Sequence, residues 1–326
     1  MSEQYNSPRT ERWAMIINPT AGKLRNHKKW NEIFRKLSIA EISYSKYYTD
    51  YEGHAIVLAR HLVENRGFRH ILIAGGDGTL HEVVNGIMTA NIPEHEKHEI
   101  VIALMPYGTG NDWGRYWGIY RGKCDIVKTL FNRKTVRFDV GTLSYTKSNG
   151  EQVVEYFTNS VGMGIDALVV YYTNILKKRF GGHSWLYTFS LLASIFFHKT
   201  ENVELIPDNT EQYYKGPLFT ANIGNSCYSG GGLKQTDGDP TDGIMFGTFI
   251  TSVSVNKILR GLKALFSQRM WDIPIAHVVQ GKHLHIRTEK PQLFEANGVL
   301  IDLRSEVDTL DFDIDIHHHA LNMLVP

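Results

Sequence analysis

Five consecutive residues, Gly75-Gly76-Asp77-Gly78-Thr79, form the stretch of this chain best suited to chemistry. They follow the apolar run 70–74 and precede the helix-like segment 80–86. A strand that breaks into glycines and then opens a helix is typical of phosphate binding, because glycines let the backbone approach an anion and a helix start offers unpaired N–H groups. Asp77 adds a carboxylate that could hold Mg²⁺ beside the phosphates. The stretch therefore predicts a site for a phosphorylated ligand, with a plain tight turn as the alternative.

A second loop of the same kind follows another apolar run, at 100–105. The loop spans 106–115 and again offers glycine, hydroxyl, amide and carboxylate groups. In an open α/β sheet, ligands bind beyond the carboxyl ends of the strands. Two such loops that converge are hard to explain as turns alone, so we expect them to contact one ligand.

The elements that must position these loops alternate between strand and helix patterns as far as about residue 135. Strand-like runs lie at 13–17, 43–48, 70–74 and 100–105, and helical spacing recurs at 28–37, 53–64 and 79–90. This alternation predicts an α/β domain with a mostly parallel, doubly wound sheet.

After residue 137 the pattern changes to many short strands separated by polar or glycine-containing turns. Helical spacing remains at 166–178, 185–198 and 255–266. We therefore expect a β-sandwich-rich second domain. The predicted domains are 12–136 and 137–316, and residues 317–326 form a C-terminal strand that returns toward the first domain.

Composition narrows the class of protein. A chain of 326 residues suggests two domains, and a formal net charge of +1 argues against a nucleic-acid partner. The polar residues 1–12 do not read as a signal peptide, and the longest apolar run, 185–197, is shorter than the roughly 20 residues that a membrane span needs. Two cysteines without a CxxC pattern suit a reducing compartment. We expect a soluble, cytoplasmic protein.

Together these motifs resemble the diacylglycerol kinase catalytic-domain family, which includes soluble bacterial lipid kinases and the sphingosine kinases. The resemblance covers nearly the whole chain and is carried by residues 18–23, 75–79, 82–86, 106–112, 137–141, 162–167, 230–232, 242–243 and 320–326. NAD kinases share the GGDGT loop, but the loop at 106–112 and the glycine triplet favour the lipid kinases. The resemblance implies a nucleotide-binding domain, a β-rich second domain and a cleft between them.

The resemblance also implies a set of residues for ATP and Mg²⁺. The predicted ATP-binding residues are Asn18, Lys23, Thr49, Gly75, Gly76, Gly78, Thr79, Glu82, Gly108, Thr109 and Asn111. Three carboxylates, from Asp77, Asp112 and Asp139, would repel a polyphosphate unless Mg²⁺ or ordered water lies between them. We therefore expect a network of Mg²⁺, carboxylates and water, with helix caps and turns as the alternative, above all for Asp139.

The position of the general base departs from the family pattern. The family's Asp-Gly-Glu motif supplies an Asp that is proposed to deprotonate the lipid hydroxyl, but here Asn297 and Val299 stand at the two acidic positions. An amide cannot act as a base at neutral pH. Three interpretations stay open: Glu295 serves instead, transfer needs no strong base, or the protein binds nucleotide and lipid without rapid turnover.

The sequence thus predicts an ATP-dependent kinase for diacylglycerol or a related lipid, which associates transiently with the inner surface of the membrane. The basic run 177–179 before the apolar stretch 185–197 suits an anionic interface, and a buried helix is the alternative. Two other functions stay open, a catalytically weak nucleotide- and lipid-binding homologue and an NAD-type small-molecule kinase. Exposed strand edges leave a homodimer open as well.

The triplet His317–His319 is the remaining group of potential metal ligands. It lies in a predicted strand, where neighbouring side chains point to opposite faces of the sheet. We therefore expect these histidines to be structural.

Overall fold

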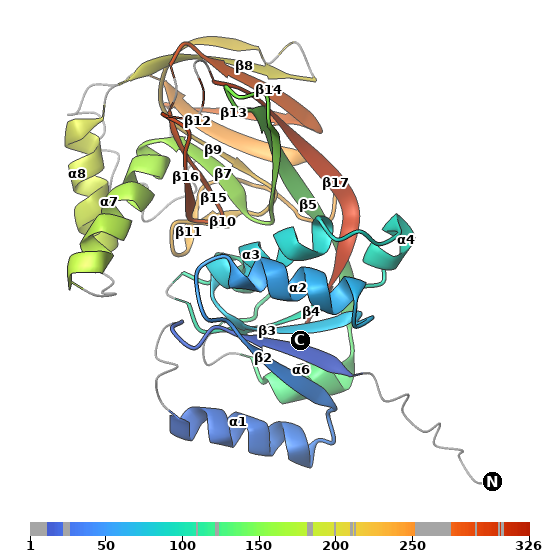
Figure 1. The fold of residues 1–326 in the computed structure, drawn as a ribbon. Coiled ribbons are helices and arrows are strands. Elements are labelled where there is room, and N and C mark those ends of the chain that lie inside the picture. Colours follow the sequence, from blue (N-terminus) through green and yellow to red (C-terminus); the bar gives the residue numbers. More distant parts are fainter. Residues whose placement is uncertain are drawn as a thin grey trace.

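The computed structural model describes residues 12–21, 27–108, 110–120, 124–180, 185–198, 200–208, 211, 213–251, 275–290, 292–305, 307 and 310–326. Figure 1 shows two stacked parts, an α/β part near the N-terminus and a β-rich part that carries two long helices on one flank. Most described strands of both parts belong to one continuous 15-stranded sheet.

The α/β part is built on four parallel strands in the order β4-β3-β1-β2. These strands are β1 (Trp13–Ile17), β2 (Tyr44–Tyr48), β3 (His70–Gly75) and β4 (Val101–Pro106). The helices of this part are α1 (His27–Ile39), α2 (His54–Glu64), α3 (Asp77–Met88), α4 (Glu94–Lys97), α5 (Asp112–Tyr116) and α6 (Ile126–Asn132).

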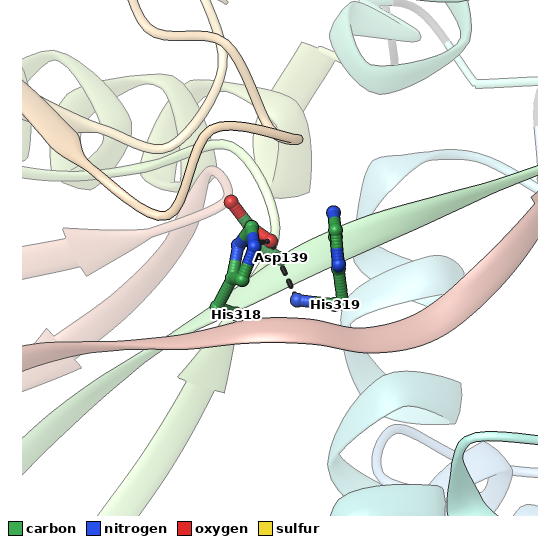
Figure 2. A group of neighbouring side chains, drawn as sticks. All are labelled: Asp139, His318 and His319. Atoms are coloured by element: carbon green, nitrogen blue, oxygen red, sulfur yellow. Dashed lines mark hydrogen bonds and ion pairs between the residues drawn. The ribbon is translucent and has the colours of Figure 1, made fainter.

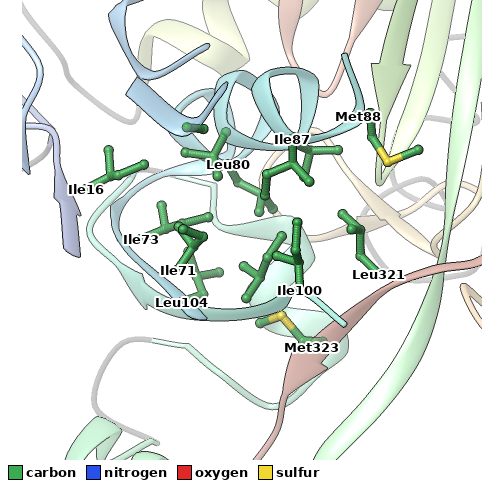
Figure 3. Packing of buried hydrophobic residues seen from close by; sticks show 14 of the residues in the cluster. Ile16, Ile71, Ile73, Leu80, Ile87, Met88, Ile100, Leu104, Leu321 and Met323 are labelled. Carbon is green, nitrogen blue, oxygen red and sulfur yellow. The ribbon is translucent and has the colours of Figure 1, made fainter. Parts of the chain in front are cut away.

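Both faces of this sheet are buried, which explains why its central strands read as unbroken apolar runs. On one face, Ile71 and Ile73 of β3 pack against α3 residues such as Leu80 (Figure 3). On the other face, Leu72 packs in a cluster with Trp30 of α1. Alternate residues of one strand therefore serve opposite helix layers, which confirms the predicted doubly wound α/β fold.

The β-rich part contains the remaining strands and two helices. The strands are β5 (Thr135–Thr146), β6 (Gln152–Phe157), β7 (Ser160–Gly164), β8 (Glu201–Pro207), β9 (Tyr214–Gly224), β10 (Tyr228–Ser229), β11 (Leu233–Lys234), β12 (Met245–Thr251), β13 (Ala276–Gly281), β14 (His283–Thr288), β15 (Leu293–Ala296), β16 (Val299–Asp302) and β17 (Leu310–Leu324). The helices are α7 (Ile165–Phe180) and α8 (Trp185–Phe197). A separate core fills this part and includes Phe157, Phe294 and Phe312. The predicted helix at 255–266 lies outside the described residues.

Two long strands, β5 and β17, connect the parts. They pair antiparallel along most of their length, with a break in register between His317 and Leu321. Beyond the break, Asn322 and Met323 pair in parallel with Val101 and Ile102 of β4. β17 thus belongs to both parts, and the domain boundaries proposed from the sequence stay predictions. Within the described part of the chain, no helix combines the length and apolar character needed to cross a membrane.

Candidate active site

A cleft of about 800 Å³ is lined by residues of both parts. The α/β part contributes the start of α3 and the loops that follow β1 and β4. The β-rich part contributes one side of α7, the glycine triplet 230–232 and the hairpin between β15 and β16. The two glycine-containing loops predicted from the sequence therefore open into the same space.

The two loops touch through their backbones at Gly76 and Gly108. A Cβ atom placed on Gly76 would lie 2.7 Å from Gly108 Cα, and one placed on Gly108 would lie 2.6 Å from Gly76 Cα. Asn111 holds the second loop closed, since its Oδ1 accepts from Gly108 N–H (2.9 Å) and its Nδ2 donates to Gly108 O (2.8 Å). The absence of side chains at both glycines therefore sets the spacing of the loops.

We expect Gly108→Ala to lower the free energy of unfolding by about 1–3 kcal/mol, because the added methyl group forces the two loops apart. Gly78→Ala is the matched control, since a Cβ on Gly78 has no atom within 4 Å and alanine favours the helix in which it lies. Urea denaturation of the nucleotide-free proteins measures both effects. Equal stability of Gly108→Ala and the unmodified protein would contradict the close contact.

Two buried carboxylates, those of Asp77 and Asp112, lie at the junction of these loops. Asp77 Oδ2 accepts from Asp112 N–H (3.1 Å), and Asp112 Oδ2 accepts from Gly231 N–H (2.8 Å). Burial raises the pKa of both carboxyl groups, and the charge of Asp112 raises that of Asp77 further. Arg115 Nε, 4.0 Å from Asp112 Oδ1, offsets part of this charge, and the remaining negative charge attracts a further cation.

The surroundings of this pair fit a hard divalent cation. Asp112 Oδ1 is buried and accepts no hydrogen bond from the described residues. A Cβ placed on Gly110 would lie 3.2 Å from Asp77 Oδ2 and 3.3 Å from Asp112 Oδ2, so glycine at this position keeps open the space beside both oxygens. Carboxylate oxygens are the protein ligands that Mg²⁺ prefers. Asp77 and Asp112 could therefore hold Mg²⁺ at this point.

Other predicted nucleotide residues surround the start of α3. Asn18, directly after β1, donates from Nδ2 to Thr79 Oγ1 (3.1 Å). The carboxylate of Glu82 accepts from Gly53 N–H and Ala55 N–H (3.0 Å each) and so caps the first turn of α2. The predicted residues that line the cleft are Asn18, Gly76, Gly78, Thr79, Glu82 and Gly108, together with Asp77 and Asp112.

The structure does not bring every predicted residue to the cleft. Thr49, Gly75 and Asn111 are buried and are not among the residues that line it. Asp139 does not line it either, because its carboxylate lies against β17 and accepts from Gly243 N–H (2.7 Å). Asp139 is therefore not grouped with Asp77 and Asp112, contrary to the sequence expectation. Lys23 and Thr109 lie outside the described residues.

Asn297 lies in the cleft as part of a tight turn between β15 and β16. Asn297 and Gly298 have φ angles of 52° and 76°, and Ala296 pairs with Val299 across the turn. Asparagine followed by glycine is favoured in two-residue hairpins with positive φ. Asn297 Oδ1 accepts from Thr158 N–H (3.1 Å) and Asn159 N–H (2.7 Å). The amide therefore stabilises the local backbone and has no capacity to accept a proton.

Sequence reasoning missed two partners of this amide, His81 and Glu155. Asn297 Nδ2 lies 3.0 Å from His81 Nδ1, which leaves His81 Nε2 to donate to Glu155 Oε1 at 2.7 Å. His81 and Glu155 both line the cleft. A signal for His81 was present, because it follows Asp77 by four residues and so lies on the same face of α3. Glu155, on β6, offered no such signal.

Two further carboxyl groups in the cleft have raised pKa values because they are buried. Burial and the neighbouring charge of Asp166 raise the pKa of Glu295 to about 8. Burial raises the pKa of Asp166, which the sequence analysis also missed, to about 6, and a hydrogen bond from Asn222 Nδ2 (2.8 Å) opposes the rise. Buried carboxyl groups with perturbed pKa values are typical of functional sites.

The cleft as a whole is rich in acidic groups. Its lining includes seven carboxyl groups, from Glu52, Asp77, Glu82, Asp112, Glu155, Asp166 and Glu295. Among the described residues that line it, Lys177 is the only lysine or arginine. A polyphosphate would be repelled here unless a divalent cation neutralised part of the charge, with the N–H groups at the start of α3 as further donors.

Comparison with known proteins agrees with this geometry. Residues 12–143 match the family described as "Diacylglycerol kinase catalytic domain", and residues 159–303 match "YegS C-terminal NAD kinase beta sandwich-like domain". A Bacillus subtilis protein named "Putative lipid kinase YtlR" is 29% identical over 241 residues, which cover 68% of this chain and 71% of that protein. A Staphylococcus carnosus protein named "Diacylglycerol kinase" is 28% identical over 217 residues, which cover 65% of this chain and 62% of that protein.

The overall fold also matches a solved structure. The crystal structure of a diacylglycerol kinase from Bacillus anthracis superposes with a TM-score of 0.70 at 20% identity and covers 98% of each chain. The two family matches together account for the α/β part and for most of the β-rich part. The chain therefore belongs to the diacylglycerol kinase catalytic-domain family and carries a YegS-type β-rich domain after the catalytic domain.

Proposed function

We propose that this protein transfers the γ-phosphoryl group of ATP to the hydroxyl of diacylglycerol or a related lipid at a membrane surface. The observation that supports this most is the contact between Gly76 and Gly108, which aligns two loops of exposed backbone beside the buried Asp77 and Asp112. Phosphoryl transfer depends mainly on positioning and on neutralising charge, and these residues are arranged for both.

In this proposal each loop has a defined role. The N–H groups at the start of α3 bind the phosphates, and the loop after β4 lies against them through the contact of Gly108 with Gly76. Asp77 and Asp112 hold Mg²⁺, which supplies positive charge against the phosphate oxygens when bound. Asn18 and Glu82 keep the surrounding backbone in place through Thr79 and Gly53.

The hydroxyl proton needs an acceptor other than Asn297. Glu295 lies two residues before it on β15 and lines the same cleft. A carboxyl group with a pKa of about 8 is a stronger base than an ordinary glutamate, although only a minority is ionised at neutral pH. We assign the proton-accepting role to Glu295.

The test is ATP-dependent labelling of a mixed lipid extract in the presence of Mg²⁺. The unmodified protein should produce a labelled lipid, and the chemical identity of that product names the substrate. A parallel assay offers NAD as the acceptor, and labelling of NAD in place of lipid would replace the proposal with the small-molecule kinase. The absence of a labelled product in both assays would contradict a kinase acting on these substrates.

A second candidate function is supported by the hydrogen bonds of Asn297. Asn297 stands where the family pattern has its base, and contacts with Thr158, Asn159 and His81 hold its amide in place. Without a base at this position, the protein could bind nucleotide and lipid without rapid turnover. Asn297→Asp separates the two functions, since aspartate retains an acceptor for both backbone N–H groups and supplies the carboxylate that the family pattern has there. Product from Asn297→Asp alone would establish the binding protein.

Membrane association in this proposal is supported by one face of α8. Phe189, Leu192 and Phe196 recur at helical spacing and are exposed, as is Phe197. α8 packs beside α7, which carries Lys177 and Arg179 and also lines the cleft (Figure 1). A helix with exposed aromatic side chains, packed beside a helix that carries basic residues, suits an anionic lipid surface.

We expect the double substitution Phe189→Ser and Phe196→Ser to weaken binding to vesicles of phosphatidylglycerol and phosphatidylcholine at least tenfold. Each phenylalanine that leaves the lipid removes about 1.5–3 kcal/mol of apolar transfer free energy. Sedimentation with sucrose-loaded vesicles gives the bound fraction. Phe131→Ser is the control, because Phe131 is 74% exposed on α6, away from this face. An equal loss in the control, or none in the double variant, would contradict this membrane face.

A further inference from the structure

β17 departs from regular strand geometry at the histidine triplet. The pairing with β5 shifts register between His317 and Leu321, and His319 has a φ of 54°. The rings of His318 and His319 consequently stack, with centroids 3.6 Å apart. Figure 2 shows both side chains on the same side of the strand. The alternation assumed from the sequence fails here because a bulge breaks the pleat.

Asp139 of β5 completes a group of three potential ligands. Its Oδ1 lies 2.9 Å from His318 Nδ1 and accepts from His319 N–H (2.7 Å). One potential ligand atom from each of the three side chains lies within 4.8 Å of the other two. In a tetrahedral zinc site with bonds of roughly 2.0–2.2 Å, the ligand atoms are roughly 3.3–3.6 Å apart, so the side chains would rotate to bring their ligand atoms closer on binding.

The buried carboxylate of Asp139 also favours a bound cation. Its side chain is fully buried, and a buried carboxylate requires a charged partner or a metal. Among the described residues, no lysine or arginine lies within ion-pair distance of it, and His318 is its only ion-pair partner.

We propose that Asp139, His318 and His319 form a binding site for a zinc-like transition-metal dication, separate from the carboxylate pair of the cleft. Two imidazole nitrogens and one carboxylate oxygen are the donors that zinc and its neighbours in the first transition row prefer, whereas Mg²⁺ prefers oxygen ligands alone. Solvent supplies the remaining position, since His318 is exposed and His319 is partly exposed.

The metal would connect β17 to the acidic loop 236–243. Asp139 N–H donates to Pro240 O (2.7 Å), and Asp139 Oδ2 accepts from Gly243 N–H (2.7 Å). From the same loop, Asp239 Oδ1 accepts from the hydroxyl of Tyr116 on α5 (3.0 Å). A metal at the bulge therefore stabilises the packing behind the cleft and has a structural role.

The experiment uses the full chain, freed of any purification tag and treated with a chelator. Zinc is titrated against a chromophoric competitor at pH 7.5 with Mg²⁺ in large excess, and the melting temperature is measured with and without zinc. We expect one zinc per chain, a higher melting temperature with zinc, and affinity at least a hundredfold lower in His318→Ala and in His319→Ala.

His317→Ala is the matched control, because His317 lies beside Tyr156, with ring centroids 6.0 Å apart, and does not belong to the group of three potential ligands. It should bind zinc as the unmodified protein does. Absence of stoichiometric zinc in the unmodified protein overturns the proposal whatever the variants do. Zinc binding that survives in both His318→Ala and His319→Ala, or that is lost equally in His317→Ala, overturns it as well.

Discussion

Replacing Asp77 with asparagine should lower the rate of lipid phosphorylation by about 10³-fold, the upper range for removing one electrostatic group from a reacting centre. Asparagine has the same shape and retains an acceptor for Asp112 N–H, but it removes the negative charge from the pair that we expect to hold Mg²⁺. The loss should appear mainly in kcat, because the charge acts on the phosphate that is being transferred.

Steady-state assays at several Mg²⁺ concentrations measure this effect, and circular dichroism checks that the variant is folded. Asp302→Asn is the control, since Asp302 is an aspartate of β16 that pairs with Arg304 and does not line the cleft. A folded Asp77→Asn protein with an unchanged rate would show that Asp77 has no part in the reaction.

Replacing Glu295 with glutamine should lower the rate by about 10²–10⁴-fold, the contribution of a positioned general base. The pKa of Glu295 is raised from its ordinary value to about 8, and only the ionised form accepts a proton. The rate of the unmodified protein should therefore rise with pH and level off above about pH 8. Glutamine retains an acceptor for Gly298 N–H, so the hairpin turn should persist.

The pH profile separates a base from a merely structural residue. Glu295→Gln should lose the rise toward pH 8 as well as the activity, whereas Glu201→Gln, a change on β8 outside the cleft, should alter neither. An unchanged rate and profile in Glu295→Gln would favour transfer without a strong base, in which the hydroxyl proton leaves late.

The sequence was most informative where local pattern and burial coincide. The run at 70–74 is apolar without alternation because both faces of β3 are covered, and that pattern alone predicts a central parallel strand. The glycines at 76 and 108 marked the two loops correctly, because close backbone approach excludes any side chain.

The parts that were not predictable depend on contacts between distant segments. Asp112 accepts from Gly231 across 119 residues, and Asp139 is held by His318 and His319 across about 180 residues. Residue spacing carries no record of such contacts. From the sequence, Asn297 was interpreted only as the loss of the general base. Its hydrogen bonds and its place in an Asn-Gly turn give a separate physical reason for an amide at this position.

Because β17 pairs with strands of both parts, the α/β part cannot complete its sheet until the end of the chain has been synthesised. β17 is the neighbour of β4 on the side opposite β3, and the hydrogen bond from Asn322 to Ile100 spans 222 residues. Until β17 has left the ribosome, the nascent α/β part exposes an unpaired strand edge that other chains could join. Closing so long a loop is slow, so we expect the α/β part to complete folding only after the β-rich part has been made, and to depend on chaperones until then.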